Sequence, residues 1–150
     1  MMKKIWLSLL GLSIALLAFS QNPVSWSFTA KKTSELTFEI HIAATIANPW
    51  TIYSQHTPDG GPLPTKISFS ANPMVKVNGT PKEVGSMQKK YEEVFEVNVL
   101  YYKSKVEFVQ TVKLKKAVKT NVAGSVEFMA CTEEQCLPAR TIPFNIPLEN

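Results

Sequence analysis

The sequence predicts an all-β domain, an immunoglobulin-like antiparallel β-sandwich. Apolar residues recur at every second position in most runs after residue 22, which is the spacing of a strand with one buried face. Turn-forming Pro, Gly and Asn residues separate these runs, and no run has the period of an amphipathic helix. About seven to nine short strands without helices between them favour two packed antiparallel sheets over a parallel sheet.

The first twenty residues form a segment of their own. Two lysines come before an almost wholly apolar run, and a small-x-small pattern ends at Ser20. This order predicts a secretory signal peptide over residues 1–20, cleaved between Ser20 and Gln21, followed by one exported domain over residues 21–150. An uncleaved membrane anchor is the less favoured alternative, because it needs roughly 20 apolar residues and this run is shorter.

Size and charge limit the function classes. A chain of 150 residues with 45% hydrophobic residues is enough for one domain with one core. The formal net charge of +4 falls by two when the lysines of the signal peptide are removed. The lysines near residues 113–119 have no interleaved aromatic residues, so they fit a solvated loop better than a nucleic-acid-binding patch. No nucleic-acid partner is expected.

Four runs show the alternation of a half-buried strand most clearly. They are Val24 to Ala30, Leu36 to Ile42, Val106 to Leu114, and Val126 to Ala130. Gln110 shares the apolar face of the third run, and the fourth run leads directly into Cys131. Turn signals lie between the runs at Asn48-Pro49, Pro58 to Pro62, Asn72-Pro73, Asn78-Gly79 and Asn121 to Gly124.

The last expected strand, around residues 142–148, has an apolar face interrupted by Pro143 and Pro147. These two prolines remove backbone donors from the same side of the strand, so the strand is expected at a sheet edge. Pro138 removes a further donor and holds the preceding residue extended. Cys136 is therefore expected where a hairpin turns onto a sheet edge, in an accessible place.

The only two cysteines are Cys131 and Cys136. Export to an oxidising compartment favours a disulfide, and their spacing suits a hairpin. A bridge that closes so short a loop stabilises a fold by only about 2 kcal/mol. From composition and spacing, a structural staple and a reactive dithiol stay open as equal alternatives. A metal site is less favoured, because His41 and His56 are the only histidines and both are expected at the surface.

The stretch "MACTEEQCLPARTIPF", together with "WTIYSQ" and "PDGGPLPTKISF", resembles the amino-terminal periplasmic domain of the thiol:disulfide interchange protein DsbD. The resemblance runs from "VSWSF" to "IPFNIPL", and its most specific part is the cysteine motif followed by Leu-Pro. It implies an immunoglobulin-like fold, a periplasmic location and no bound cofactor. It also implies thiol-disulfide exchange, in which a thioredoxin-like donor passes electrons through the domain to periplasmic oxidoreductases, isomerases or thioredoxins of cytochrome c maturation.

Carried over by position, Cys136 forms the mixed disulfide with partners and Cys131 resolves it, which implies a protein-disulfide reductase. Better-known members have one more residue between the cysteines, and they continue into a membrane domain and a thioredoxin-like domain. Here the sequence ends at Asn150. A free-standing domain or a fragment is expected, with another protein as electron donor. We further expect a monomer that meets the membrane only through a partner.

In that family an aromatic residue at the tip of a cap loop shields the cysteines, and position places Phe95 at the tip with Glu93 nearby. A plain core aromatic is an equal alternative for Phe95. Tyr53 falls on a tyrosine that lines the family's active site, with a buried tyrosine bonded to backbone as the alternative. Pro138 follows the second cysteine in the motif and is counted with the lining residues.

Glu133 and Glu134 lie between the cysteines and should raise the thiol pKa, since no Lys, His or helix amino-terminus is adjacent to lower it. The resting thiols should be poor nucleophiles, so exchange should depend on a docked partner that moves the cap. The competing function is a secreted binding or assembly module with a merely structural disulfide, whose free edge strand would suit strand-addition contacts.

Overall fold

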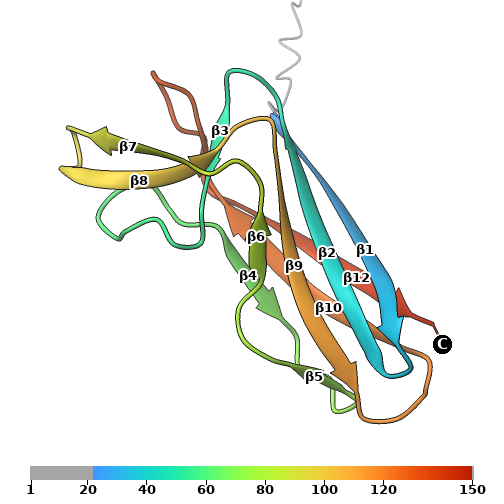
Figure 1. The fold of residues 1–150 in the computed structure, drawn as a ribbon. Helices are drawn as coiled ribbons and strands as arrows, with labels where there is room; N and C mark the ends of the chain where they lie inside the picture. Colours follow the sequence, from blue (N-terminus) through green and yellow to red (C-terminus); the bar gives the residue numbers. More distant parts are fainter. Residues whose placement is uncertain (1–21, 150) are drawn as a thin grey trace, which may run out of the picture.

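The computed structural model describes residues 22–149, and every regular element in this range is a strand (Figure 1). The expected signal peptide lies outside the described residues. Twelve strands are present between residues 22 and 149, more than the seven to nine expected. Four of them have only two or three residues, too few to show an alternating pattern. This part of the chain contains no helical segment with the length and hydrophobicity that a membrane crossing requires.

Two antiparallel sheets form the layers of a sandwich. The first contains β1 (Val24–Ser34), β2 (Thr37–Ile46), β9 (Lys105–Leu114) and β5 (Val75–Val77) in that order, and β6 (Lys82–Val84) also pairs with β9. The second contains β12 (Arg140–Leu148), β10 (Thr120–Phe128) and β4 (Lys66–Phe69). All pairs within both layers are antiparallel, as the sequence predicts.

The facing sides of the two layers form the main core. Phe108 from the first layer and Phe128 from the second are at most 2% exposed. Trp26 of β1 bridges the layers, with its ring centre 5.2 Å from that of Phe128. Gln110 is buried on the apolar face of β9, and its Nε2 donates to the carbonyl of Asn78 at 2.7 Å. Two aligned layers with one apolar core are the predicted sandwich.

The strand β12 lies at the edge of its sheet and pairs only with β10 among the described strands. Pro143 and Pro147 therefore lack an N–H on a side that meets no further strand. The prediction of an edge strand is confirmed.

A third antiparallel sheet extends from one end of the sandwich. It contains β11 (Ala130–Cys131), β3 (Thr51–Tyr53), β8 (Val97–Tyr102) and β7 (Gln88–Glu92) in that order. Figure 1 shows the β7–β8 hairpin projecting from this end of the molecule. The sequence did not predict this sheet as a separate unit.

The two faces of the third sheet have different surroundings. Ile52 of β3, Tyr102 of β8 and Ala130 of β11 point into the main core. The neighbouring residue on each strand points the opposite way, because side chains alternate along a strand. These neighbours, together with Val99 on the same face of β8, form a second, smaller buried group, which we call the site cluster: Tyr53, Val99, Tyr101 and Cys131. One face of the sheet thus completes the core, and the other carries the first cysteine.

Candidate functional site

The two cysteines close a short hairpin, residues 130–137, which we call the cysteine hairpin. Cys131 and Cys136 form a disulfide between residues that pair as an antiparallel bridge, with their Cα atoms 4.0 Å apart. The N–H of Leu137 donates to the carbonyl of Ala130 at 2.9 Å, which extends the pairing. Because β11 is the outer strand beside β3, Cys136 lies at the edge of the third sheet.

Thr132 holds the loop between the cysteines in one shape. Its N–H donates to the carbonyl of Gln135 at 2.7 Å. Its hydroxyl oxygen accepts from the N–H of Glu134 and from the N–H of Gln135, both at 3.2 Å. A hydroxyl that satisfies the N–H groups of a turn fixes the turn without further strand pairing. Glu133, Glu134 and Gln135 are therefore exposed on a fixed backbone.

The two cysteines differ in exposure. Cys131 is 2% exposed and belongs to the site cluster, whereas Cys136 is exposed. Thiol-disulfide exchange depends on access to the sulfur that is attacked. The geometry therefore favours Cys136 as the residue that meets a partner, and the assignment of attacking and resolving roles stays a prediction.

A hollow of about 190 Å³, which we call the disulfide hollow, lies against both cysteines. Phe95 and Val94, from the turn between β7 and β8, form part of its wall. Phe95 is 45% exposed and Val94 is 85% exposed. Phe95 is therefore not a core residue, and that alternative is wrong. We call residues 93–96 the cap turn.

The cap turn has a defined backbone and a close support. The N–H of Phe95 donates to the carbonyl of Glu92 at 3.2 Å, and Glu96 has φ 55°. A left-handed residue after such a turn is a common way to end a hairpin loop. Gly61 lies close to the turn, because a Cβ there would lie 3.9 Å from Cβ of Phe95 and 3.1 Å from Cγ2 of the following Val97. The cap turn therefore has a defined backbone conformation.

Two residues expected to line the site do not line the disulfide hollow. Glu93 and Pro138 are exposed and lie outside its wall. Glu92 takes the place expected for Glu93, because Glu92 is the last paired residue of β7 and Glu93 has already entered the turn. Pro138 lies beyond Leu137, where the backbone pairing of the cysteine hairpin ends.

The structure brings Lys90 to the acidic loop between the cysteines. Lys90 Nζ lies 2.6 Å from Oε1 of Glu92 and 3.3 Å from Oε1 of Glu133. Burial lowers the pKa of Lys90, but the hydrogen bonds to these two carboxylates outweigh it and the pKa is raised. Pairing of β7 with β8 brings Lys90 across 43 positions of sequence to Glu133, and no local pattern signals such a contact.

Tyr53 is 4% exposed and lines the disulfide hollow. Burial raises the pKa of its phenol, while a hydrogen bond with Thr51 and the charge of Lys90 act in the opposite direction. The phenol is therefore neutral at neutral pH. A neutral phenol adds no negative charge beside a sulfur that must become a thiolate.

Glu83 of β6 fixes the segment that follows Tyr53. Its carboxylate accepts hydrogen bonds from the hydroxyl of Ser54 at 2.8 Å, from the N–H of Gln55 at 2.7 Å and from the hydroxyl of Tyr102 at 2.6 Å. Burial, together with the bond to Glu83, raises the pKa of Tyr102 strongly. The side-chain amide of Gln55 also donates to the Glu83 carboxylate, at 3.3 Å, so one carboxylate with four donors ties β6 and β8 to the end of β3.

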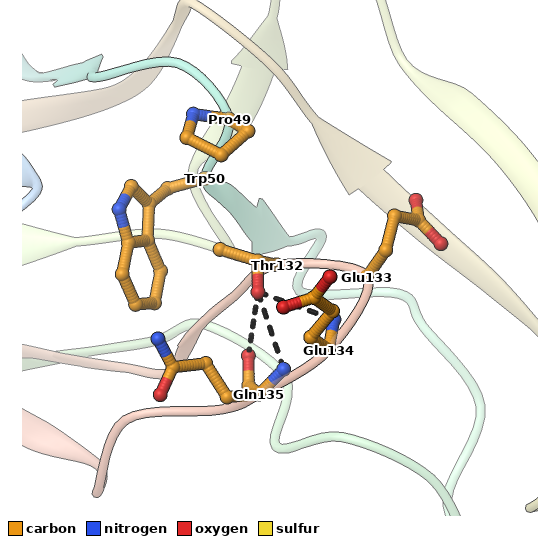
Figure 2. Close-up of a pocket in the computed structure, with 6 residues that line it drawn as sticks. All are labelled: Pro49, Trp50, Thr132, Glu133, Glu134 and Gln135. Carbon is orange, nitrogen blue, oxygen red and sulfur yellow. Dashed lines mark hydrogen bonds between the residues drawn. The ribbon is translucent and has the colours of Figure 1, made fainter.

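A second hollow, of about 400 Å³, lies between Trp50 and the loop of the cysteine hairpin, and we call it the Trp50 hollow. Trp50 packs against the main core, as Ile52 does, whereas Tyr53 belongs to the site cluster. Figure 2 shows the indole facing the loop, and Glu133 pointing away from it. Trp50 was not among the expected site residues, and its only signal in the sequence is its place in the stretch "WTIYSQ".

The two histidines lie outside both hollows. His41 contacts the carboxylates of Glu39 and Glu107, and His56 is exposed. Within residues 22–149, no three His, Cys, Asp or Glu side chains are grouped in a way that could hold a metal ion.

Comparison with known proteins identifies a family and supports the fold. The family model described as "Thiol:disulfide interchange protein DsbD, N-terminal" matches residues 17–146. No curated protein matches the chain.

Three solved structures are similar. The N-terminal periplasmic domain of ScsB from Proteus mirabilis has 16% identity and a TM-score of 0.56, and the match covers 86% of this chain and 47% of that one. The reduced DsbD N-terminal domain of Neisseria meningitidis has 15% identity and a TM-score of 0.52, over 82% and 86% of the two chains. A complex of the DsbD and PilB N-terminal domains from Neisseria meningitidis has 14% identity and a TM-score of 0.54, over 81% and 80%. At such identities the likeness establishes the fold, and the predicted immunoglobulin-like sandwich is confirmed.

Proposed function

The chain belongs to the family of the DsbD N-terminal domain, and on this premise we propose that it is an exported thiol-disulfide exchange domain. Its Cys131–Cys136 pair passes reducing equivalents from a thioredoxin-like donor to oxidoreductases of the envelope. In this role the domain acts as a protein-disulfide reductase. Membership of the family supports thiol-disulfide transfer as the chemistry.

The observation that carries the proposal is the position of the disulfide. The common staple of an immunoglobulin-type sandwich joins its two sheets through the core. Here the disulfide closes a hairpin at a sheet edge, with Cys136 exposed and Cys131 2% exposed. A bridge in this place contributes little to the fold and leaves one residue of the pair open to a partner.

The exchange needs two displacements at sulfur. The Cys136 thiolate attacks a disulfide sulfur of the acceptor, forms a mixed disulfide and displaces one acceptor thiolate, which takes up a proton. Cys131 then loses its proton and attacks the sulfur of Cys136, which closes the Cys131–Cys136 disulfide and releases the second acceptor thiol. Two electrons pass to the acceptor. A dithiol donor restores the reduced pair by the reverse sequence.

Phe95 is the proposed gate over the pair. It lines the disulfide hollow together with both cysteines, and its side chain is free of the core. We expect Phe95→Ala to accelerate alkylation of Cys136 in a reduced Cys131→Ala background, because access limits the rate. The check is the rate with a small neutral alkylating reagent at fixed pH, with Val84→Ala as a matched loss of an exposed apolar side chain outside the hollow. An unchanged rate would exclude the gate.

The proposed location is the periplasm, and the proposed partners are proteins with thioredoxin-like domains. The similar ScsB domain is periplasmic, and a similar DsbD domain has been solved in complex with a PilB domain. Export requires the expected signal peptide over residues 1–20. The mass of the exported protein should therefore correspond to a chain that begins at Gln21.

Trapping of mixed disulfides tests the function directly. Cys131→Ala removes the resolving thiol, so adducts at Cys136 should accumulate with envelope proteins and should disappear on adding dithiothreitol. Cys136→Ala is the matched control and should trap little. Equal trapping by Cys136→Ala would reverse the two roles, and no adduct with either variant would leave only a structural disulfide.

The reduction potential separates exchange from a structural role independently. Structural disulfides usually have potentials below about −300 mV, whereas exchanging ones are more oxidising. We expect the Cys131–Cys136 pair to equilibrate above that value in redox buffers. A lower potential would favour the secreted binding module.

A further inference from the structure

The Trp50 hollow has a chemistry that the exchange reaction does not use. One of its walls is Trp50 with Pro49, and the other is the loop of residues 132–135. The same loop also lines the disulfide hollow, so the two hollows share a wall. An aromatic face and an acidic loop meet at one opening beside the reactive pair.

The two carboxylates of this loop differ in their surroundings. Glu133 lies 3.3 Å from Lys90 Nζ, so its charge is compensated, and Figure 2 shows it pointing away from Trp50. No ion pair joins Glu134 to another residue in the part of the chain that the structure describes. The N–H of Glu134 is bonded to Thr132, which fixes where this side chain leaves the backbone. The Trp50 hollow therefore has an uncompensated negative charge.

A guanidinium group matches this combination of an indole face and a carboxylate. It is a planar cation that stacks on an aromatic ring and pairs with a carboxylate at the same time. An ammonium group is a compact and strongly hydrated charge, so it gains less from the ring. A volume of about 400 Å³ has room for one such side chain with its water.

The area that an exchange partner buries should also extend beyond the disulfide hollow. Even weak redox complexes bury several hundred Å² on each partner, more than a hollow at one disulfide supplies. Tryptophan and arginine are enriched among the residues that carry most binding energy. A contact at the Trp50 hollow, next to the contact at the disulfide hollow, would orient an exchange partner.

We infer that the Trp50 hollow binds an arginine side chain of the exchange partner, located near the partner cysteine that reacts with Cys136. This inference rests on the exchange function proposed above. Gln135 lines the hollow and precedes Cys136 directly, so their Cα atoms are about 3.8 Å apart. A bound arginine therefore holds the partner's sulfur near Cys136 and selects partners that carry arginine beside their disulfide.

The test uses peptide disulfides as acceptors and the whole mature chain in its reduced form. The probe is the symmetric disulfide of acetyl-Cys-Gly-Arg-amide, and the comparison peptides carry citrulline or lysine in place of arginine. Each reaction forms the Cys131–Cys136 disulfide and converts the peptide disulfide into two thiols, so electrons and protons balance. Citrulline has nearly the shape of arginine without its charge. We expect the arginine peptide to react about tenfold faster than the citrulline peptide, and also faster than the lysine peptide.

Substitutions in the chain show which residues cause the faster reaction with the arginine peptide. Glu134→Gln and Trp50→Leu should each bring the ratio of the arginine rate to the citrulline rate close to one. Glu134→Gln also removes a charge beside the cysteines and should raise both rates together, so the ratio is the quantity compared. Glu93→Gln removes the same charge from an exposed residue that lines neither hollow, and it should keep the preference. Trp50 also packs against the main core. If Trp50→Leu does not fold, Glu134→Gln decides the result.

Each other outcome has a definite reading. Equal rates for the arginine and citrulline peptides would overturn the inference and leave the exchange function standing. Equal rates for arginine and lysine would show charge attraction without a guanidinium site, and would also overturn it. A full preference retained in Glu134→Gln would place the contact elsewhere. A reduced chain that reacts with none of the peptides would overturn both proposals.

Discussion

The main core and the site cluster differ in what they bury. The main core consists mostly of aliphatic and phenylalanine side chains from both layers, whereas the site cluster consists of two tyrosines, a valine and Cys131. The large apolar side chains that the described residues leave exposed all lie between residues 84 and 95, from the end of β6 through β7 to the cap turn. The main core therefore lies in the sandwich, whereas the exposed apolar side chains Val94 and Phe95 lie at the disulfide hollow.

This difference shows how the main core can fix the backbone of the site while the site side chains stay outside the core. The strands β3, β8 and β11 each place one residue in the main core and its neighbour in the site cluster. The core therefore fixes the backbone of the site, while the side chains on the other face are free of the core. Substitutions on the core face should therefore change mainly the free energy of unfolding, and substitutions on the site face mainly the reactivity of the cysteines.

A pair of phenylalanine substitutions should show the contrast most clearly. Phe108 is fully buried, so Phe108→Ala should lower the free energy of unfolding by about 3–5 kcal/mol. Phe95 is 45% exposed, so Phe95→Ala should change it by less than about 1 kcal/mol. Urea unfolding of both variants at pH 7 measures the two losses. Similar losses would show that the cap turn is part of the same cooperative core.

Reduction of the disulfide should have a moderate effect. The bridge spans 5 positions of sequence and joins no two layers, so its loss should lower the free energy of unfolding by about 2 kcal/mol or less. The reduced domain should remain folded, with an unchanged far-ultraviolet circular dichroism spectrum. Cooperative unfolding on adding dithiothreitol at room temperature would instead make the pair a structural staple.

Alkaline pH should weaken the fold through Tyr102. Its pKa is raised in the folded state by burial and by Glu83, so above pH 10 the unfolded chain binds fewer protons than the folded one. Stability therefore falls as pH rises, by about 1 kcal/mol between pH 10 and pH 11. The pKa values of Tyr53 and Lys90 are also raised and act in the same direction.

The comparison that isolates Tyr102 is the wild type against Tyr102→Phe. The variant loses the hydrogen bond to Glu83 at every pH, but its stability should depend less on pH above 10. Urea unfolding at pH 8, 10 and 11 measures the two slopes. Parallel slopes would assign the alkaline loss to other groups.

The smallest effect is expected at the exposed ion pair of Lys90 and Glu133. Lys90→Gln leaves the carboxylate beside the cysteines uncompensated, so alkylation of Cys136 in the reduced protein should slow by a factor of about 2–5. Glu133→Gln should accelerate it, and the double variant should return close to the wild-type rate. The measurement is alkylation by a neutral reagent at fixed pH and low salt. A double variant that stays as slow as Lys90→Gln would show that the lysine does not act through Glu133.

The long strands of the sandwich could be predicted from the sequence, because each buries one face against the other layer. Alternation in β2 and β9 placed Ile40 and Phe108 inside, and Gln110 with them. The short strands β3, β5, β6 and β11 could not be found this way, since two or three residues cannot show a period. The strand β7 could not be predicted either, because none of its five residues is buried and its sequence shows no apolar face.

The sequence by itself determined an all-β sandwich with an edge strand, and a cysteine pair in a hairpin after a buried run. These features depend on local alternation, turn residues and proline positions, which act over a few neighbouring residues. Only the tertiary structure decided what surrounds the pair. Thr51 bonds to the carbonyl of Cys131 across 80 positions of sequence, and Lys90 reaches Glu133 across 43. Such neighbours are set by which strands pair and in which register, and register follows from burial of the whole sheet.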